Sequence, residues 1–137
     1  MAQKPETRFS KTLHDLFPET TYVEKTNNPF RGGVPDFYYE FGAGQIMWCE
    51  HKFYTRLPPV MNLVESEKLT SLQNRWLKRS FYNGNSTCVL VGFKVANRYK
   101  AIALHAPGEW STDIRRESVL DLALDLTDMV QHLHYVD

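Results

Sequence analysis

The feature that most constrains the fold is a pair of β-type runs on either side of a short glycine-bearing loop. The runs cover residues 34–41 and 45–53, and both are rich in aromatic and β-branched residues. Residues 42–44 between them read Gly-Ala-Gly, which is typical of a β-hairpin turn. A hairpin centred on the alanine places Asp36 opposite Glu50. The sequence therefore predicts two acidic side chains facing each other across the hairpin.

The chemistry of this acidic pair indicates a function. Side chains alternate across a strand, so Lys52 lies on the same face as Asp36 and Glu50. Like charges directly opposed across strands are destabilising, so the two acids either share a proton or bind a divalent cation, for which carboxylate oxygens are preferred ligands. A metal with a lysine beside it suits phosphodiester hydrolysis, because the metal activates water and offsets developing negative charge. An ordinary surface hairpin with a Glu–Lys pair is the alternative.

Length and charge set the broad class. A chain of 137 residues predicts one domain with a core that needs no disulfides. The net charge is zero, so any nucleic-acid contact must use a local basic patch. The N-terminus lacks an apolar signal core, and no apolar run is long enough to span a bilayer, which predicts a soluble cytoplasmic protein without membrane contact. We expect the two cysteines, Cys49 and Cys88, to be buried reduced thiols.

Periodicity and turn residues predict the other elements in chain order. Before the hairpin, we expect a helix over residues 5–17, a strand over 20–26 and a loop over 27–33. After it, we expect a long connection over 54–69, which forms one wall of a cleft. The second half of the chain is expected to form strands over 86–95 and 100–105, an irregular segment over 106–116 and a last helix over 117–133. The strand over 86–95 is apolar throughout, which is typical of a central strand covered on both faces. The apolar last helix belongs either to the core or to a dimer surface.

A further helix begins at a recognisable cap. Thr70 and Gln73 match the capping box that opens a helix, and an apolar stripe through Leu69, Leu72, Trp76, Leu77 and Ser80 follows. Positive side chains lie off this stripe and form a basic side, which consists of Lys68, Arg75, Lys78 and Arg79. Asn83-Gly84-Asn85 ends the helix.

The arrangement resembles a known family of nucleases. Pro35-Asp36 followed by Glu50-His51-Lys52 on a predicted hairpin resembles the signature of the PD-(D/E)xK nuclease superfamily. The predicted order of elements is similar to its restriction-endonuclease-like αβββαβ core, an α/β fold with a mixed central sheet between helices. The segment from Leu72 to Leu77 resembles the Q-x-x-W helix of the VRR-Nuc-like branch and of Holliday-junction resolvases. The match covers residues 5–95, and the chain's size resembles phage-encoded or archaeal-type resolvases.

The resemblance implies a role for each matching residue. Asp36 and Glu50 are implied as ligands of Mg²⁺, for which Mn²⁺ substitutes, with the backbone carbonyl of His51 as a further ligand. Lys52 is implied to orient the attacking water or to stabilise transition-state charge. Gln73 is implied to support the site, although the capping box explains it equally well. Glu6 matches the first-helix acid that completes the metal shell, although a carboxylate there also suits the helix dipole.

One residue departs from the pattern, and several basic residues complete the prediction. The position between the glutamate and the lysine is usually aliphatic in this superfamily, whereas here it is His51, which we expect to be a core histidine with a hydrogen-bond partner. Candidate DNA contacts are Arg31, beside two glycines that allow close backbone approach, together with Lys68, Arg75, Lys78 and Arg79.

Three functions follow from these residues. The first is a divalent-metal-dependent endonuclease that cuts branched DNA, such as a Holliday junction, in recombination, repair or phage DNA processing, as a dimer with one site for each of two strands. The second is a phage nuclease in the host cytoplasm that nicks or degrades DNA without junction preference. The third is a catalytically inactive DNA-binding module on the same fold, against which the intact Asp36, Glu50 and Lys52 argue.

Overall fold

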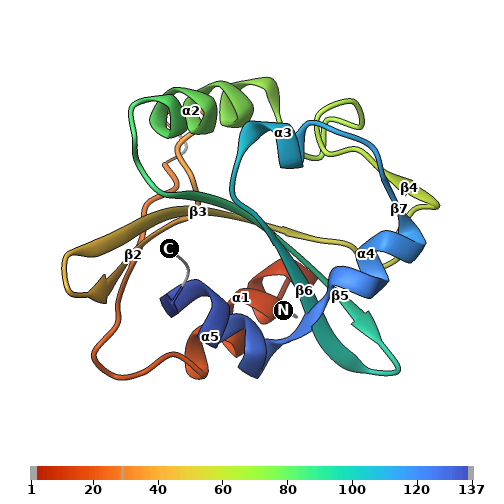
Figure 1. The fold of residues 1–137 in the computed structure, drawn as a ribbon, viewed down its shortest axis with the longest axis horizontal. Coiled ribbons are helices and arrows are strands. Elements are labelled where there is room, and N and C mark those ends of the chain that lie inside the picture. The colour runs from red at the N-terminus through yellow and green to blue at the C-terminus, as the bar shows by residue number, and fades with distance from the viewer. Residues whose placement is uncertain (1–2, 29, 136–137) are drawn as a thin grey trace.

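The chain folds into helices that cover both faces of one mixed β-sheet (Figure 1). The computed structural model describes residues 3–28 and 30–135. The helices are α1 (Pro5–Asp15), α2 (Ser71–Tyr82), α3 (Pro107–Trp110), α4 (Arg116–Leu122) and α5 (Leu126–Tyr135). The strands are β1 (Tyr22–Lys25), β2 (Phe37–Gly42), β3 (Gln45–Phe53), β4 (Val60–Met61), β5 (Thr87–Val95), β6 (Arg98–Leu104), β7 (Ile114–Arg115) and β8 (Leu124–Asp125).

The main sheet has the strand order β1-β2-β3-β5-β6-β8. Neighbouring strands are antiparallel except β3 and β5, which are parallel. A parallel pair needs a crossover connection, and residues 54–86 supply it through α2. The order α1, β1, β2, β3, α2, β5 confirms the predicted αβββαβ core. The short pair β4 and β7 forms a separate two-stranded sheet, whose first strand lies within the crossover.

Strand β5 lies in the interior of this sheet because its side chains are apolar on both faces. Its first seven residues, 87–93, are all buried, and it pairs with β3 on one side and β6 on the other. This confirms the predicted central strand. Helices α1 and α5 lie on one side of the sheet, and α2 and α3 lie on the other (Figure 1).

Each face of the sheet has its own apolar core. The core on the α1 and α5 side includes Phe9, Leu13, Tyr39, Met47, Leu90 and Leu133. The core on the α2 and α3 side includes Met61, Leu77, Val89, Val91, Trp110 and Val119. Cys49 and Cys88 are neighbours in the β3–β5 register on the first side, and both are buried free thiols as predicted.

The expected histidine of the core is also present. His51 is fully buried, and its two ring nitrogens lie 2.7 Å from the Ser10 hydroxyl and 2.8 Å from the Tyr39 hydroxyl. Burial lowers the pKa of His51 well below its usual value, and the neighbouring His14 lowers it further. A neutral, hydrogen-bonded histidine therefore replaces the usual aliphatic residue behind the hairpin.

Three expectations were wrong. The last helix over residues 117–133 is interrupted, because Ala123 has an extended backbone and the next two residues form β8 along β6. The segment over 106–116 is not wholly irregular, since it contains α3 and β7. The apolar stripe of α2 is not buried throughout, because Leu72 is 51% exposed. Of the helices that the structure describes, none has the length and apolar character needed to cross a membrane.

Candidate active site

The predicted hairpin register is observed. Phe37 pairs with Cys49, Tyr38 with Trp48 and Tyr39 with Met47, before a register shift close to the turn. Asp36 is the residue just before β2, so the same register leads from it to Glu50. The backbone N–H of Asp36 donates to Glu50 Oε1 at 3.2 Å. The two acids are therefore brought together as the sequence predicted.

The two acids are held by reciprocal backbone hydrogen bonds. While Glu50 accepts from the backbone of Asp36, the Asp36 side chain accepts from the backbone N–H of His51, with 3.0 Å between Oδ2 and N. Asp36 also has its backbone carbonyl tied to the N–H of Thr26 at 2.8 Å. These bonds fix the start of β2 against the end of β3, so the carboxylates have little freedom to separate.

Lys52 lies between the acidic pair and helix α2. Its Nζ is 3.2 Å from Glu50 Oε2 and donates to Gln73 Oε1 at 3.0 Å. Lys52 is 9% exposed and Glu50 is 2% exposed, so this ion pair is shielded from water. A buried pair of this kind is costly to form and needs further hydrogen bonds, which Gln73 and the backbone of Asp36 provide.

Gln73 serves the helix and the site at once. Its backbone N–H donates to Thr70 Oγ1 at 3.2 Å, and its side-chain Oε1 accepts from the backbone N–H of Thr70 at 3.0 Å, so the capping box is complete. The same Oε1 accepts from Lys52. The two alternatives for this residue, capping and contact with Lys52, therefore coexist.

The three acidic side chains near the site have raised pKa values. Burial raises the pKa of Glu50 to about 8, the charge of Asp36 adds to the effect, and Lys52 opposes it. Burial is also the main cause of the raised pKa of Asp36, which the hydrogen bond from His51 partly offsets. Glu6, in the first turn of α1, has a pKa raised by burial and then by Asp36. The site is thus partly desolvated, and its carboxyl groups ionise less readily than free ones.

The side chains fit a hard divalent cation in their chemistry. Two carboxylates that repel each other in a buried place gain most from a cation between them, and oxygen ligands are those that Mg²⁺ and Mn²⁺ prefer. Within residues 3–28 and 30–135, no group of three His, Cys, Asp or Glu side chains is close enough together to hold one ion. The metal-ligand roles of Asp36, Glu50, Glu6 and the His51 carbonyl therefore all stay predictions.

The connection after β3 contributes to the surroundings of Glu6. A surface hollow of about 380 Å³ is lined by Glu6, Tyr54 and Lys68, with Lys4, Pro5, Phe53, Thr55 and Arg56. The ammonium of Lys68 lies 4.5 Å from the centre of the Tyr54 ring, and burial lowers the pKa of Lys68, an effect that Glu6 partly offsets. Lys68 is therefore nearer to the acids than a residue on the outer side of α2 would be.

The remaining basic residues lie on the outside of the α2 side. Arg75, Lys78 and Arg79 are exposed, and Arg31 is exposed on the loop before β2. The guanidinium of Arg79 lies 4.9 Å from the centre of the Trp76 ring, and Trp76 packs on Trp48 of β3 with 5.1 Å between ring centres. This aromatic contact is a feature that sequence reasoning missed, although strand alternation puts Trp48 on the same face of β3 as Glu50 and Lys52.

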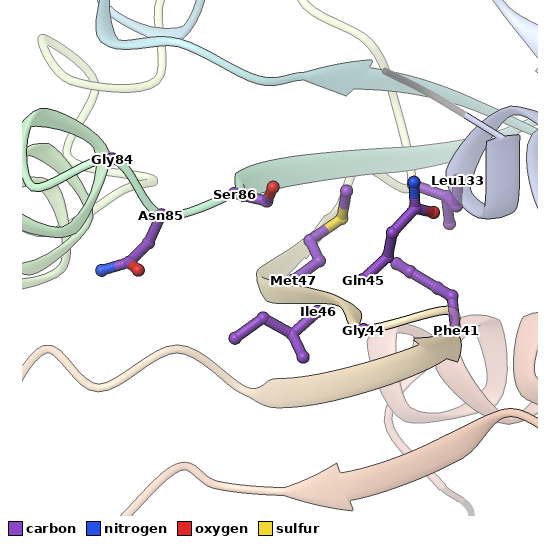
Figure 2. A pocket seen from close by; sticks show the side chains of 9 residues that line it. All are labelled: Phe41, Gly44, Gln45, Ile46, Met47, Gly84, Asn85, Ser86 and Leu133. Atoms are coloured by element: carbon purple, nitrogen blue, oxygen red, sulfur yellow. The ribbon is translucent and has the colours of Figure 1, made fainter.

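Another hollow lies at the opposite end of β3. It has a volume of about 290 Å³ and is formed by the β2–β3 turn, residues 84–86 and Leu133 (Figure 2). Its polar side chains, Gln45, Asn85 and Ser86, carry no ionisable group. None of the predicted site residues lines this hollow.

No family model matches this chain, and no curated protein matches it. Among solved structures, that of Hjc, a Holliday junction resolvase from the archaeal hyperthermophile Archaeoglobus fulgidus, is similar to the structure of this chain. The TM-score is 0.49 and the identity is 15%, over 90% of this chain and 98% of that one. We therefore base the function on this protein's own residues.

Proposed function

We propose that this protein is a divalent-metal-dependent endonuclease that hydrolyses phosphodiester bonds in branched DNA, in recombination, repair or phage DNA processing. The observation that carries the proposal is the juxtaposition of Asp36, Glu50 and Lys52 in one buried place, with Glu50 bonded to both of the others. Two carboxylates that can hold a divalent cation, with an ammonium beside them, suit phosphodiester hydrolysis. The metal activates water, and both cations offset the negative charge that develops on the phosphate.

Each residue has a role that follows from its position. Asp36 and Glu50 would hold Mg²⁺ or Mn²⁺, which supplies an acidic water and offsets charge on the phosphate oxygens when bound. Lys52 would place its ammonium beside the attacked phosphate, where negative charge develops in the transition state. Gln73 keeps that ammonium in position through its side-chain oxygen. The exposed Arg31, Arg75, Lys78 and Arg79 would contact phosphates further along the DNA, because the net charge of the chain supplies no overall attraction.

A panel of DNA substrates tests this function. Cleavage of a four-way junction, a flap, a single strand and a linear duplex of the same sequence is measured with Mg²⁺, with Mn²⁺ and with EDTA. We expect metal-dependent cutting at least about tenfold faster on the branched substrates, a difference of about 1.4 kcal/mol in transition-state binding. Equal cutting of duplex and junction would give the nonselective phage nuclease instead. Binding to all substrates without any cutting would indicate the inactive DNA-binding module.

Metal binding has a test that does not depend on activity. The pKa of Glu50 in the folded protein, about 8, lies above the value of 4.5 expected for an unfolded glutamate. Its contribution to stability is therefore fully present below pH 4.5 and is lost as the pH rises towards 8. A divalent cation binds the ionised carboxylates, so we expect Mg²⁺ to raise the Tm by a few degrees at pH 8 and by less at pH 5.

Glu50→Gln is the control for that measurement. It removes the charge while keeping a side chain of the same shape, so its Tm at pH 8 should be less sensitive to Mg²⁺. Lys11→Gln, at an exposed ion pair with Asp15, should keep the response of the unchanged protein. Equal shifts in all three proteins would indicate that the metal binds elsewhere.

The sequence suggested the apolar segment 117–133 as the surface of a dimer, but few of its apolar residues are available for such a contact. Most apolar residues of segment 117–133 are in the core, including Val119, Met129 and Leu133. Among the apolar residues of this segment, only Leu120 and Leu122 of helix α4 are substantially exposed, at 43% and 62%. We propose homodimerisation as part of the function, and the molar mass in solution, measured with and without a four-way junction, tests it.

A further inference from the structure

One phenylalanine differs from all the others in its exposure to solvent. Phe30 is 93% exposed, whereas every other phenylalanine in the chain is buried or half-buried. An exposed aromatic ring forgoes the burial that stabilises the rest of the fold. Phe30 lies in the loop that joins β1 to β2 and leads directly into Asp36. An exposed apolar side chain therefore lies on the segment that ends at Asp36 of the proposed site.

Local hydrogen bonds hold the backbone around Phe30. Its own N–H donates to Asn28 Oδ1 at 2.8 Å, and the N–H of Arg31 donates to the backbone carbonyl of Asn28 at 3.1 Å. Such bonds define a tight turn. Phe30 and Arg31 are therefore consecutive residues of one tight turn, and both side chains are exposed.

The loop is also anchored at its base, beside the acids. Thr26 bonds to the chain on the other side of the loop twice, through its N–H to the carbonyl of Asp36 and through its hydroxyl to the carbonyl of Pro35, each at 2.8 Å. Gly33 has φ +89°, and a Cβ at this position would lie 2.5 Å from the carbonyl oxygen of Leu72. The loop therefore packs against the start of α2, one residue before Gln73.

We propose that Phe30 is a base-stacking residue, which contacts an unstacked nucleobase next to the phosphate bound at Asp36 and Glu50. The inference rests on the proposed function and adds to it the origin of the preference for branched DNA. An aromatic face stacks on any base that is not already stacked, and a branch point or a single strand offers such bases while an intact duplex does not. Arg31 would bind the phosphate of the same nucleotide.

The experiment measures stacking without cleavage. A four-way junction carries one 2-aminopurine at the branch, and its fluorescence and affinity are followed in EDTA with the full-length protein. We expect Phe30→Ala to weaken junction binding by at least about fivefold and to remove the fluorescence quenching, while duplex binding is unchanged. Phe30→Trp should restore both, and Phe30→Leu, which is apolar but cannot stack in the same way, should not. The matched control is Tyr135→Ala, because Tyr135 is 75% exposed on α5.

The outcomes separate this inference from the proposed function. Loss of quenching in Phe30→Ala together with absence of cleavage under all metal conditions would support the stacking role and reject the nuclease. Metal-dependent cleavage by a Phe30→Ala protein whose junction affinity and quenching equal those of Tyr135→Ala would overturn the stacking role and leave the nuclease intact. Equal weakening of duplex and junction binding would also overturn it, because the bases within an intact duplex are stacked on both faces and leave no free face for Phe30.

Discussion

Asp36→Asn should abolish metal-dependent DNA cleavage, with a rate at least about 100-fold lower, while DNA affinity in EDTA stays within about twofold. The asparagine keeps an oxygen that accepts from the backbone of His51, so the start of β2 stays in place. It removes the negative charge on which binding of a cation with Glu50 depends. Lys52→Ala should have a similar effect for a different reason, because it removes the ammonium that lies 3.2 Å from Glu50.

An exposed acid–lysine pair elsewhere in the chain supplies the control for these variants. Lys11 and Asp15 form a 3.1 Å ion pair on α1, with their side chains 64% and 66% exposed. Asp15→Asn and Lys11→Ala make the same chemical changes at a place without a role in catalysis, so both should cleave at the rate of the unchanged protein. Undiminished cutting by Asp36→Asn or by Lys52→Ala would reject the assigned site. Loss of cutting that is accompanied by a lower Tm would point to a folding defect instead.

Phe9→Ala should lower the free energy of unfolding by about 3–5 kcal/mol, the usual cost of removing a fully buried phenylalanine. Phe9 has 0% exposure, and its ring centre lies 5.6 Å from that of Phe53 and 5.8 Å from that of Tyr99. Its ring also rests on Gly92 of β5, where an added Cβ would be 2.4 Å from it. The cavity left by alanine would therefore lie between α1 and the sheet.

The measurement is chemical denaturation of the full chain, and the exposed Phe30 provides its control. Phe30→Ala removes a side chain of equal size from a 93% exposed position, so the free energy of unfolding should change by less than about 0.5 kcal/mol. A loss in Phe9→Ala as small as that in Phe30→Ala would show that α1 does not pack on the sheet as described.

The central hairpin could be predicted because its information is local. The Gly-Ala-Gly loop sets the turn, and the alternation of side chains sets which residues share a face, so the register of Tyr38 with Trp48 follows from the sequence. The capping box at Thr70 and Gln73 was predictable for the same reason, since all its atoms lie within four residues. These two local features are enough to bring the two acids together and to fix the residue at which α2 begins.

The last helix was predicted wrongly because a distant strand competes for its backbone. Residues 119–133 have apolar side chains at helical spacing, but Leu124 and Asp125 pair with Lys100 and Ala101 of β6 instead. Without them, these groups of β6 would lack a neighbour at that edge of the sheet. An ion pair of 2.7 Å between Lys100 and Asp125 accompanies this pairing. Periodicity within one segment carries no information about a free strand edge formed elsewhere.

The chain's sequence by itself determined the elements whose hydrogen bonds close within a few residues, and with them the facing of Asp36 and Glu50. Only the tertiary structure decided that Gln73 meets Lys52, that Lys68 approaches Glu6 and that Phe30 stays in solvent. The physical reason is that these contacts join segments whose separation in the chain leaves no local pattern. They depend on how the crossover helix and the β1–β2 loop pack on the same end of the sheet.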